Sequence, residues 1–107
     1  MSDFISPLKV RLKEARLNKD LSQKSLGILI GIDQFSASSR MNHYEVGRHV
    51  PDNLTLHKIS NVLDVPLAYF YCENDLMAKL LIAIHQKNIK DAQQLFKDLI
   101  NIDNSTD

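Results

Sequence analysis

The sequence has few of the residues that cross-link a chain or interrupt its regular structure. Its 107 residues include one cysteine, three glycines, three prolines and no tryptophan. The single cysteine, Cys72, excludes an internal disulfide framework and fits a cytosolic protein in which it fills space. The scarcity of glycine and proline argues against disorder and against a turn-rich all-β chain. The longest apolar run, 80–84, is far too short to cross a membrane, and Met1–Pro7 has no apolar signal-peptide core.

Signatures of catalysis are missing as well. There is no phosphate-binding loop, no dinucleotide-binding glycine motif and no nucleophile elbow. The four histidines have no spacing typical of metal ligands; they are His43, His49, His57 and His85. We therefore expect no enzyme, no metal site and no cofactor.

Charge is balanced overall but unevenly distributed. Residues 1–50 hold eight lysines and arginines against five acids, whereas residues 51–107 hold five against eight. A polyanion would therefore meet the N-terminal half first, and the C-terminal half would face away from it.

Apolar residues recur at helical spacing along the whole chain and no segment alternates as a strand does, so the predicted fold class is all-α. The expected helices cover residues 7–18, 22–30, 37–46, 53–63, 67–71, 75–86 and 90–102, followed by a frayed polar tail, Asp103–Asp107. The first begins at Ser6-Pro7 and carries Lys9, Arg11, Lys13 and Glu14 on its polar side.

The second and third helices carry the strongest local signals. Ser22 is the expected N-cap of the second helix, whose buried side is Leu26, Leu29 and Ile30. Gly27 in mid-helix costs roughly 1 kcal/mol against alanine, which indicates close approach of a crossing helix. Gly31 supplies the left-handed residue that ends the helix. For the third helix either Asp33 or Ser36 provides the cap, and Ser36 is favoured.

The third helix has an unusual outer face. Ala37, Met41 and Tyr44 form its apolar side, and the opposite side has short polar side chains and one imidazole: Ser38, Ser39, Asn42 and His43. Serine and asparagine are poor helix formers, so a purely solvated face would be expected to use other residues. Short polar groups let a helix enter the DNA major groove, where asparagine pairs with adenine. The pattern fits either a reading helix or a serine-rich surface helix without a partner.

A family resemblance favours the first interpretation. Over about residues 6–72 the chain resembles the Cro/CI-type helix-turn-helix repressors, also called the xenobiotic-response-element type. The matching positions are Ser22-Gln23, Leu26, Gly31-Ile32, Met41, Tyr44-Glu45, Gly47, Pro51, Leu56, Ile59, Leu63, Val65-Pro66 and Tyr69. The resemblance implies a five-helix lambda-repressor-like DNA-binding domain over residues 6–72. The two helices expected over residues 75–102 lie beyond that domain and form a C-terminal two-helix extension.

The resemblance also implies roles for individual residues. Arg16 is expected to form a partly buried ion pair with Glu45. The base-reading residues implied are Ser38, Ser39, Arg40, Asn42 and His43. The phosphate-contacting residues implied are Gln23, Lys24, Ser36 and Arg48.

One departure from the family concerns the entry to the third helix. Between Gly31 and Tyr44 the chain has four residues more than the compact members. Either the turn is longer or the third helix gains a turn at its start, so the sequence leaves the conformation of residues 32–36 open.

The C-terminal extension carries more apolar surface than two isolated helices can expose. It either packs on the DNA-binding domain or forms a two-fold interface, and we favour the interface. The expected protein is a cytoplasmic, bacterial or phage-encoded regulator. It binds double-stranded DNA as a homodimer on a near-palindromic operator and acts as a repressor. The alternative is an antitoxin-like or adaptor protein whose C-terminal helices bind a protein partner, with DNA binding secondary.

Overall fold

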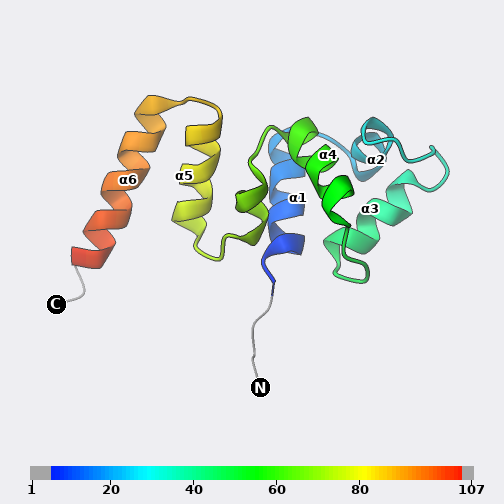
Figure 1. The fold of residues 1–107 in the computed structure, drawn as a ribbon, viewed down its shortest axis with the longest axis horizontal. Helices are drawn as coiled ribbons and strands as arrows, with labels where there is room; N and C mark the ends of the chain where they lie inside the picture. The colour runs from blue at the N-terminus through cyan, green and yellow to red at the C-terminus, as the bar shows by residue number, and fades with distance from the viewer. Residues whose placement is uncertain (1–5, 105–107) are drawn as a thin grey trace, which may run out of the picture.

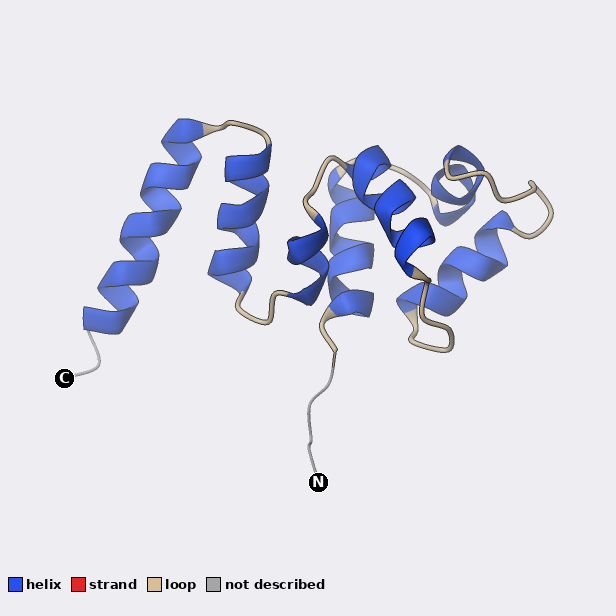
Figure 2. Ribbon diagram, viewed as in Figure 1, coloured by secondary structure: helices blue, strands red, loops and turns tan. Residues whose placement is uncertain are grey.

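The computed structural model describes residues 6–104, and side chains through residue 102. Within that range every regular element is helical, as Figure 2 shows, which confirms the all-α prediction. The elements are α1 (Leu8–Asn18), α2 (Gln23–Leu29), α3 (Ala37–Glu45), α4 (Asn53–Leu63), the 3-10 helix η1 (Leu67–Tyr71), α5 (Asp75–His85) and α6 (Ile89–Asn104). None of the described helices is long and apolar enough to cross a membrane.

Short polar side chains start four of these helices, including α6, where Asn88 Oδ1 accepts from Asp91 N at 3.2 Å. The Ser22 hydroxyl accepts a hydrogen bond from Ser25 N at 2.9 Å, as predicted for α2. Asp52 Oδ1 accepts from Thr55 N at 2.7 Å, and Asn74 Oδ1 accepts from Met77 N at 2.8 Å. Each bond satisfies one of the N–H groups that the first turn of a helix leaves without a partner.

The core lies where α1, α2, α3, α4 and η1 meet (Figure 1). Its largest fully buried side chains are Tyr69, Phe70, Leu12, Leu26, Met41, Leu56, Ile59 and Leu63. Cys72 is buried beside them as a free thiol, which confirms its expected role as a packing residue. The apolar stripes predicted on α1, α3 and α4 therefore converge on one centre.

Gly27 lies where α2 crosses α3. A Cβ on Gly27 would come within 2.7 Å of the Ala37 Cβ and within 2.9 Å of the Ala37 Cα and O. Real Cβ atoms essentially never approach this closely, so α2 and α3 cross too closely for a side chain at position 27 unless one of them shifts. The predicted close approach at Gly27 is confirmed, and Gly31 adopts the expected positive φ of 98°.

The junction between η1 and α5 is built around Arg11, which had been assigned to the polar side of α1. That assignment was wrong, since Arg11 is only 2% exposed. Its Nε donates to the Cys72 carbonyl at 2.9 Å, and its Nη2 donates to Asp75 Oδ1 at 2.9 Å. Burial alone would lower the pKa of Arg11, but the hydrogen bonds to Asp75 and Glu14 leave that pKa raised overall.

The two halves of the C-terminal extension differ in how they are held. Helix α5 packs on the core through Ala78, Leu81 and Ile82, and its C-terminal end is tied back by Gln86 Nε2, which donates to the Asp64 carbonyl at 3.1 Å. Helix α6 lies against the far side of α5, as Figure 1 shows. Helix α5 thus packs on the predicted DNA-binding domain of the same chain, whereas α6 retains an exposed side.

Three local expectations were wrong. Leu29 is 58% exposed because α2 stops at that residue and the core takes Leu26 and Ile30 instead. Pro7, not Ser6, occupies the position just before α1, although the Ser6 hydroxyl accepts from Leu8 N at 3.3 Å. Asp103 and Asn104 were expected in a frayed tail but belong to α6, which continues to Asn104; the rest of the predicted tail, residues 105–107, lies outside the described part.

The Gly27 contact gives a stability prediction. Gly27→Ala is expected to lower the free energy of unfolding by up to about 2 kcal/mol, because overpacking of about 1–3 kcal/mol outweighs a gain of roughly 1 kcal/mol in helix propensity. Urea denaturation measures the change. The control is Lys24→Ala, an exposed position on the same helix, which should stay within about 0.5 kcal/mol of the parent. A more stable Gly27→Ala protein would contradict the close crossing.

Candidate nucleic-acid interface

The exposed side of α3 carries most of the predicted reading residues. Ser38, Ser39, Arg40 and Asn42 are exposed, and His43 is half-buried. The apolar side is as predicted for Ala37 and Met41, both fully buried, and Tyr44 is partly buried against the core. The short polar side chains of the helix therefore face outward because its apolar stripe is buried in the core.

One carboxylate, that of Glu45, fixes the position of α3. Its Oε2 accepts from Arg16 Nε at 2.6 Å and its Oε1 accepts from Arg16 Nη2 at 3.0 Å, so the pair is bidentate. The side chains are 9% and 3% exposed, for Arg16 and Glu45 respectively. The third guanidinium nitrogen of Arg16, Nη1, donates to the Leu21 carbonyl at 2.8 Å. This is the ion pair that the resemblance implied, and it joins α1 to the end of α3.

Gln23 extends that arrangement to the reading face. Its Nε2 lies 3.2 Å from Glu45 Oε1 and 3.2 Å from Asn42 Oδ1, and donates to both. An amide nitrogen has two hydrogens, so both donors of Gln23 are used within the protein. The first residue of α2 thereby orients the Asn42 amide, a contact that the sequence alone did not indicate.

The other edge of the face is a shallow hollow. It gathers four of the predicted residues with three neighbours, and its lining is Ser36, Ser39, Arg40, His43, Tyr44, His49 and Val50. This lining contains a cation and two imidazoles but no acid, which suits an anionic partner. The structure thus divides the predicted face into this hollow and the edge formed by Asn42 and Gln23.

His49, which the sequence left as either a neighbour of a phosphate or a bystander, lies beside His43 in this hollow. Gly47 has a φ of 80° and reverses the chain after α3, and the N–H groups of Arg48 and His49 both donate to the His43 carbonyl, at 2.9 and 3.2 Å. The reversal brings the rings of His43 and His49 to a centroid distance of 5.1 Å. Residues six positions apart do not lie side by side on a helix. The stop signal at Gly47 was therefore the only sequence feature that could have suggested the contact between His43 and His49.

The segment before α3 shows where the four extra residues between Gly31 and Tyr44 lie. They lengthen the loop rather than α3, which begins at Ala37. Ser36 makes no side-chain cap, contrary to the favoured expectation; Asp33 Oδ1 instead accepts from Phe35 N at 2.9 Å and from Ser36 N at 3.2 Å. Hydrogen bonds from the Ser36 side chain and the Phe35 N–H lower the pKa of Asp33. An ionised carboxylate suits this place because the N–H groups at the start of a helix attract negative charge.

The remaining phosphate candidates lie at the edges of this surface. Lys24 is exposed in the first turn of α2, and Arg48 is exposed directly after Gly47. Ser36 is half-buried in the hollow. Among the residues that the structure describes, no group of three or more histidines, cysteines and acids could hold a metal ion.

Comparison with known proteins agrees with this geometry. A helix-turn-helix family model matches residues 12–70. The crystal structure of transcriptional regulator BswR is similar over 89% of this chain and 97% of that chain, with 41% sequence identity and a TM-score of 0.73. The uncharacterized HTH-type transcriptional regulator YqaE of Bacillus subtilis (strain 168) is 40% identical over 58 residues, which are 54% of this chain and 47% of that protein. The match thus spans about half the length of this curated relative.

The chain belongs to the Cro/CI-type helix-turn-helix family of DNA-binding transcriptional regulators. Its α2 and α3 are the helix-turn-helix pair, and α3 stands where the family has its reading helix.

The buried ion pair gives a prediction for stability. Glu45→Ala is expected to lower the free energy of unfolding by about 3–5 kcal/mol, because Arg16 then keeps a buried charge without its partner. Urea denaturation tests this, with Glu73→Ala, an exposed carboxylate, as the control within about 0.5 kcal/mol of the parent. The double variant Arg16→Met with Glu45→Leu should recover most of the loss. A loss below about 1 kcal/mol for Glu45→Ala would refute the structural role of the pair.

Proposed function

We propose that this protein is a sequence-specific repressor that binds a near-palindromic operator as a homodimer in the bacterial cytoplasm. Helix α3 enters the major groove and its outer face reads base edges, and bound protein occludes the promoter. The observation that carries the proposal is the Glu45–Gln23–Asn42 arrangement. It places an oriented amide on the exposed side of a helix that is fixed to the core.

Asn42 is the central reading residue in this proposal. Its Oδ1 already accepts one hydrogen bond from Gln23, which leaves a second lone pair and its own NH₂ group. Adenine presents an N6 donor and an N7 acceptor in the major groove, and an oriented asparagine amide matches both. Ser38, Ser39, Arg40 and His43 are the further proposed base readers.

Phosphate contacts are proposed for Gln23, Lys24, Ser36 and Arg48. Lys24 and Arg48 are exposed cations at the ends of the two helices, and cations supply the salt-dependent part of DNA affinity. Gln23 contacts a phosphate only if one of its two amide hydrogens is redirected from α3. DNA binding would then loosen the link to Asn42 or to Glu45.

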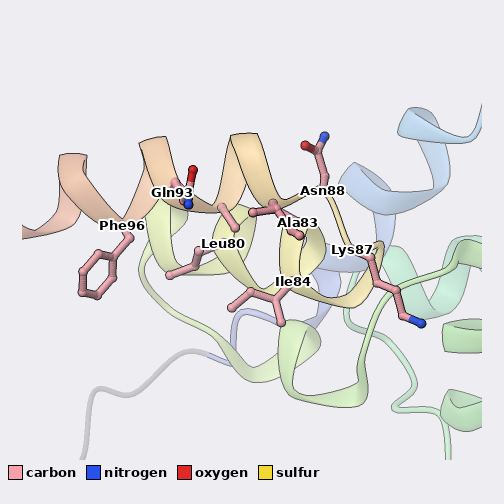
Figure 3. Close-up of a pocket in the computed structure, with 9 residues that line it drawn as sticks. Leu80, Ala83, Ile84, Lys87, Asn88, Gln93 and Phe96 are labelled. Atoms are coloured by element: carbon pink, nitrogen blue, oxygen red, sulfur yellow. The ribbon is translucent and has the colours of Figure 1, made fainter.

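The dimer surface is proposed on α5 and α6, at the end of the molecule away from α3 (Figure 1). Leu80, Ile84 and Phe96 lie along one side of this helix pair, as Figure 3 shows, and they line an apolar groove with a single charged side chain, Lys87. Large apolar side chains on the same two helices are exposed: Met77, Ile84, Ile89, Phe96 and Ile100. A second copy offers the same largely apolar face, and it leaves both α3 helices free for half-sites about one DNA turn apart.

The proposal as a whole is tested on the DNA that flanks the gene of this protein. A footprint there should cover two half-sites related by a two-fold axis, and gel-shift affinity should fall steeply with salt. Material purified from the host should contain this chain alone. A tight second protein together with no sequence preference on DNA would favour the antitoxin-like or adaptor alternative, in which the apolar groove of α5 and α6 binds that protein.

Asn42→Ala is expected to weaken binding to the specific site by about 1–3 kcal/mol and to relax the preference at one base pair. Competition gel shifts against single-base operator variants measure both effects. Arg48→Ala is the matched control, because a phosphate contact carries no sequence information. It should weaken all duplexes about equally and reduce the salt slope by about one. Unchanged base preference in Asn42→Ala would show that α3 reads with other residues.

Phe96→Asp is expected to convert the dimer to a monomer, because the carboxylate would be buried in an apolar interface without a partner. Sedimentation equilibrium measures the change. Asn101→Asp introduces the same charge at an exposed position of α6 outside the groove and should leave the dimer intact. A parent protein that is monomeric at all accessible concentrations would refute this surface as a dimer interface.

A further inference from the structure

The loop before α3 holds an exposed aromatic side chain that no role above requires. Phe35 is 90% exposed, the highest value among the exposed large apolar side chains of the described residues. A phenylalanine can bury 150–250 Å² when it is covered, so leaving the ring in water is unfavourable. Phe35 lies within the longer loop that distinguishes this chain from compact members of its family.

The loop is held in one conformation. Asp33 Oδ1 accepts from the N–H groups of Phe35 and Ser36, at 2.9 and 3.2 Å, and the Asp33 carbonyl accepts from Ala37 N at 2.9 Å. These bonds fix the backbone on both sides of the Phe35 side chain. The ring is therefore presented by an ordered turn, and a partner that covers it has no loop to order first.

The register of that turn relates Phe35 to the reading face. The bond from Ala37 N to the Asp33 carbonyl closes one turn, and the 3.0 Å bond from Arg40 N to the Ser36 carbonyl belongs to the first turn of α3, so Phe35 lies in a single turn directly before that helix. Phe35 precedes Ser39 by four residues and Asn42 by seven. Phe35 therefore lies in the turn at the N-terminal end of the helix that carries the proposed reading face.

We propose that Phe35 is a further base-contacting residue, whose ring packs against the C5-methyl group of a thymine in the major groove. The inference rests on the proposed function, since it requires α3 to enter that groove. The thymine methyl is the apolar group that bases display there, and apolar side chains meet it by direct contact. Phe35 would then add preference for a T·A pair next to the bases read by Ser39 and Asn42.

The test uses the full chain and a duplex that this chain itself selects from a random library. Each thymine of that duplex is replaced singly by deoxyuridine, which removes only the methyl group. The parent protein should lose affinity about three- to fivefold at one thymine per half-site, the value expected for one buried methyl-sized group. Phe35→Ala should lose a similar factor on the thymine duplex and nothing more on the corresponding deoxyuridine duplex, because both changes remove the same contact.

Two control variants separate this contact from other effects. Tyr71→Ala removes an exposed aromatic ring on η1, away from α3, and should bind both duplexes like the parent. Phe35→Leu keeps an apolar side chain and should keep the sensitivity to deoxyuridine. The unfolding midpoints of these variants should match the parent, since each side chain lies on the surface.

Three results would overturn the inference. Phe35→Ala could bind the selected duplex as tightly as the parent. It could lose affinity and yet retain every deoxyuridine penalty, which would place the ring on sugar and phosphate or on a protein partner. Finally, a parent protein that selects no sequence at all would overturn the proposed function and this inference with it. The first two results leave the proposed function intact.

Discussion

The bidentate ion pair between Arg16 and Glu45 is the interaction on which the reading surface depends. It joins α1, the centre of the core, to the last residue of α3, and Gln23 adds α2 to the same carboxylate. A charge pair in so buried a place is stable only because nearly every polar atom is satisfied, here by the Leu21 carbonyl and the Gln23 amide. The ion pair and the Gln23 amide therefore hold α3 in place, and the hydrogen bond from Gln23 orients the Asn42 amide.

A second buried arginine links the reading domain to the C-terminal helices. Arg11 reaches the Cys72 and Glu73 carbonyls and the Asp75 carboxylate, with Tyr69 beneath its guanidinium at 5.9 Å. Burial of Tyr69 and its hydrogen bond to Glu14 raise the pKa of this phenol, so it stays a donor. Helix α5 is consequently fixed to the DNA-binding domain, and only α6 stands apart. In a dimer formed through α6, this junction would determine how far apart the two α3 helices lie.

Most of the fold was predictable because its signals are local. The caps, the glycine stops and the apolar spacing place the helices within a residue or two, and Gly27 predicts a close crossing because a mid-helix glycine is otherwise unfavourable. The candidate site was predictable only in part. The short polar side of α3 follows from its spacing, whereas the hydrogen bond from Gln23 to Asn42 joins residues nineteen positions apart. Helical spacing carries no information about such contacts.

The sequence by itself determined the all-helical class, the apolar stripes and the polar face of α3, since each depends on neighbours within a turn or two. The tertiary structure alone decided that Arg11 is buried and that Leu29 is exposed. The physical reason is distance along the chain. Arg11 is buried because of acceptors more than sixty residues away, and no pattern in its own helix records them. Within Ser22–Arg48, the conformation of residues 32–36 and the approach of His49 to His43 depend on turn geometry, which helical spacing does not encode.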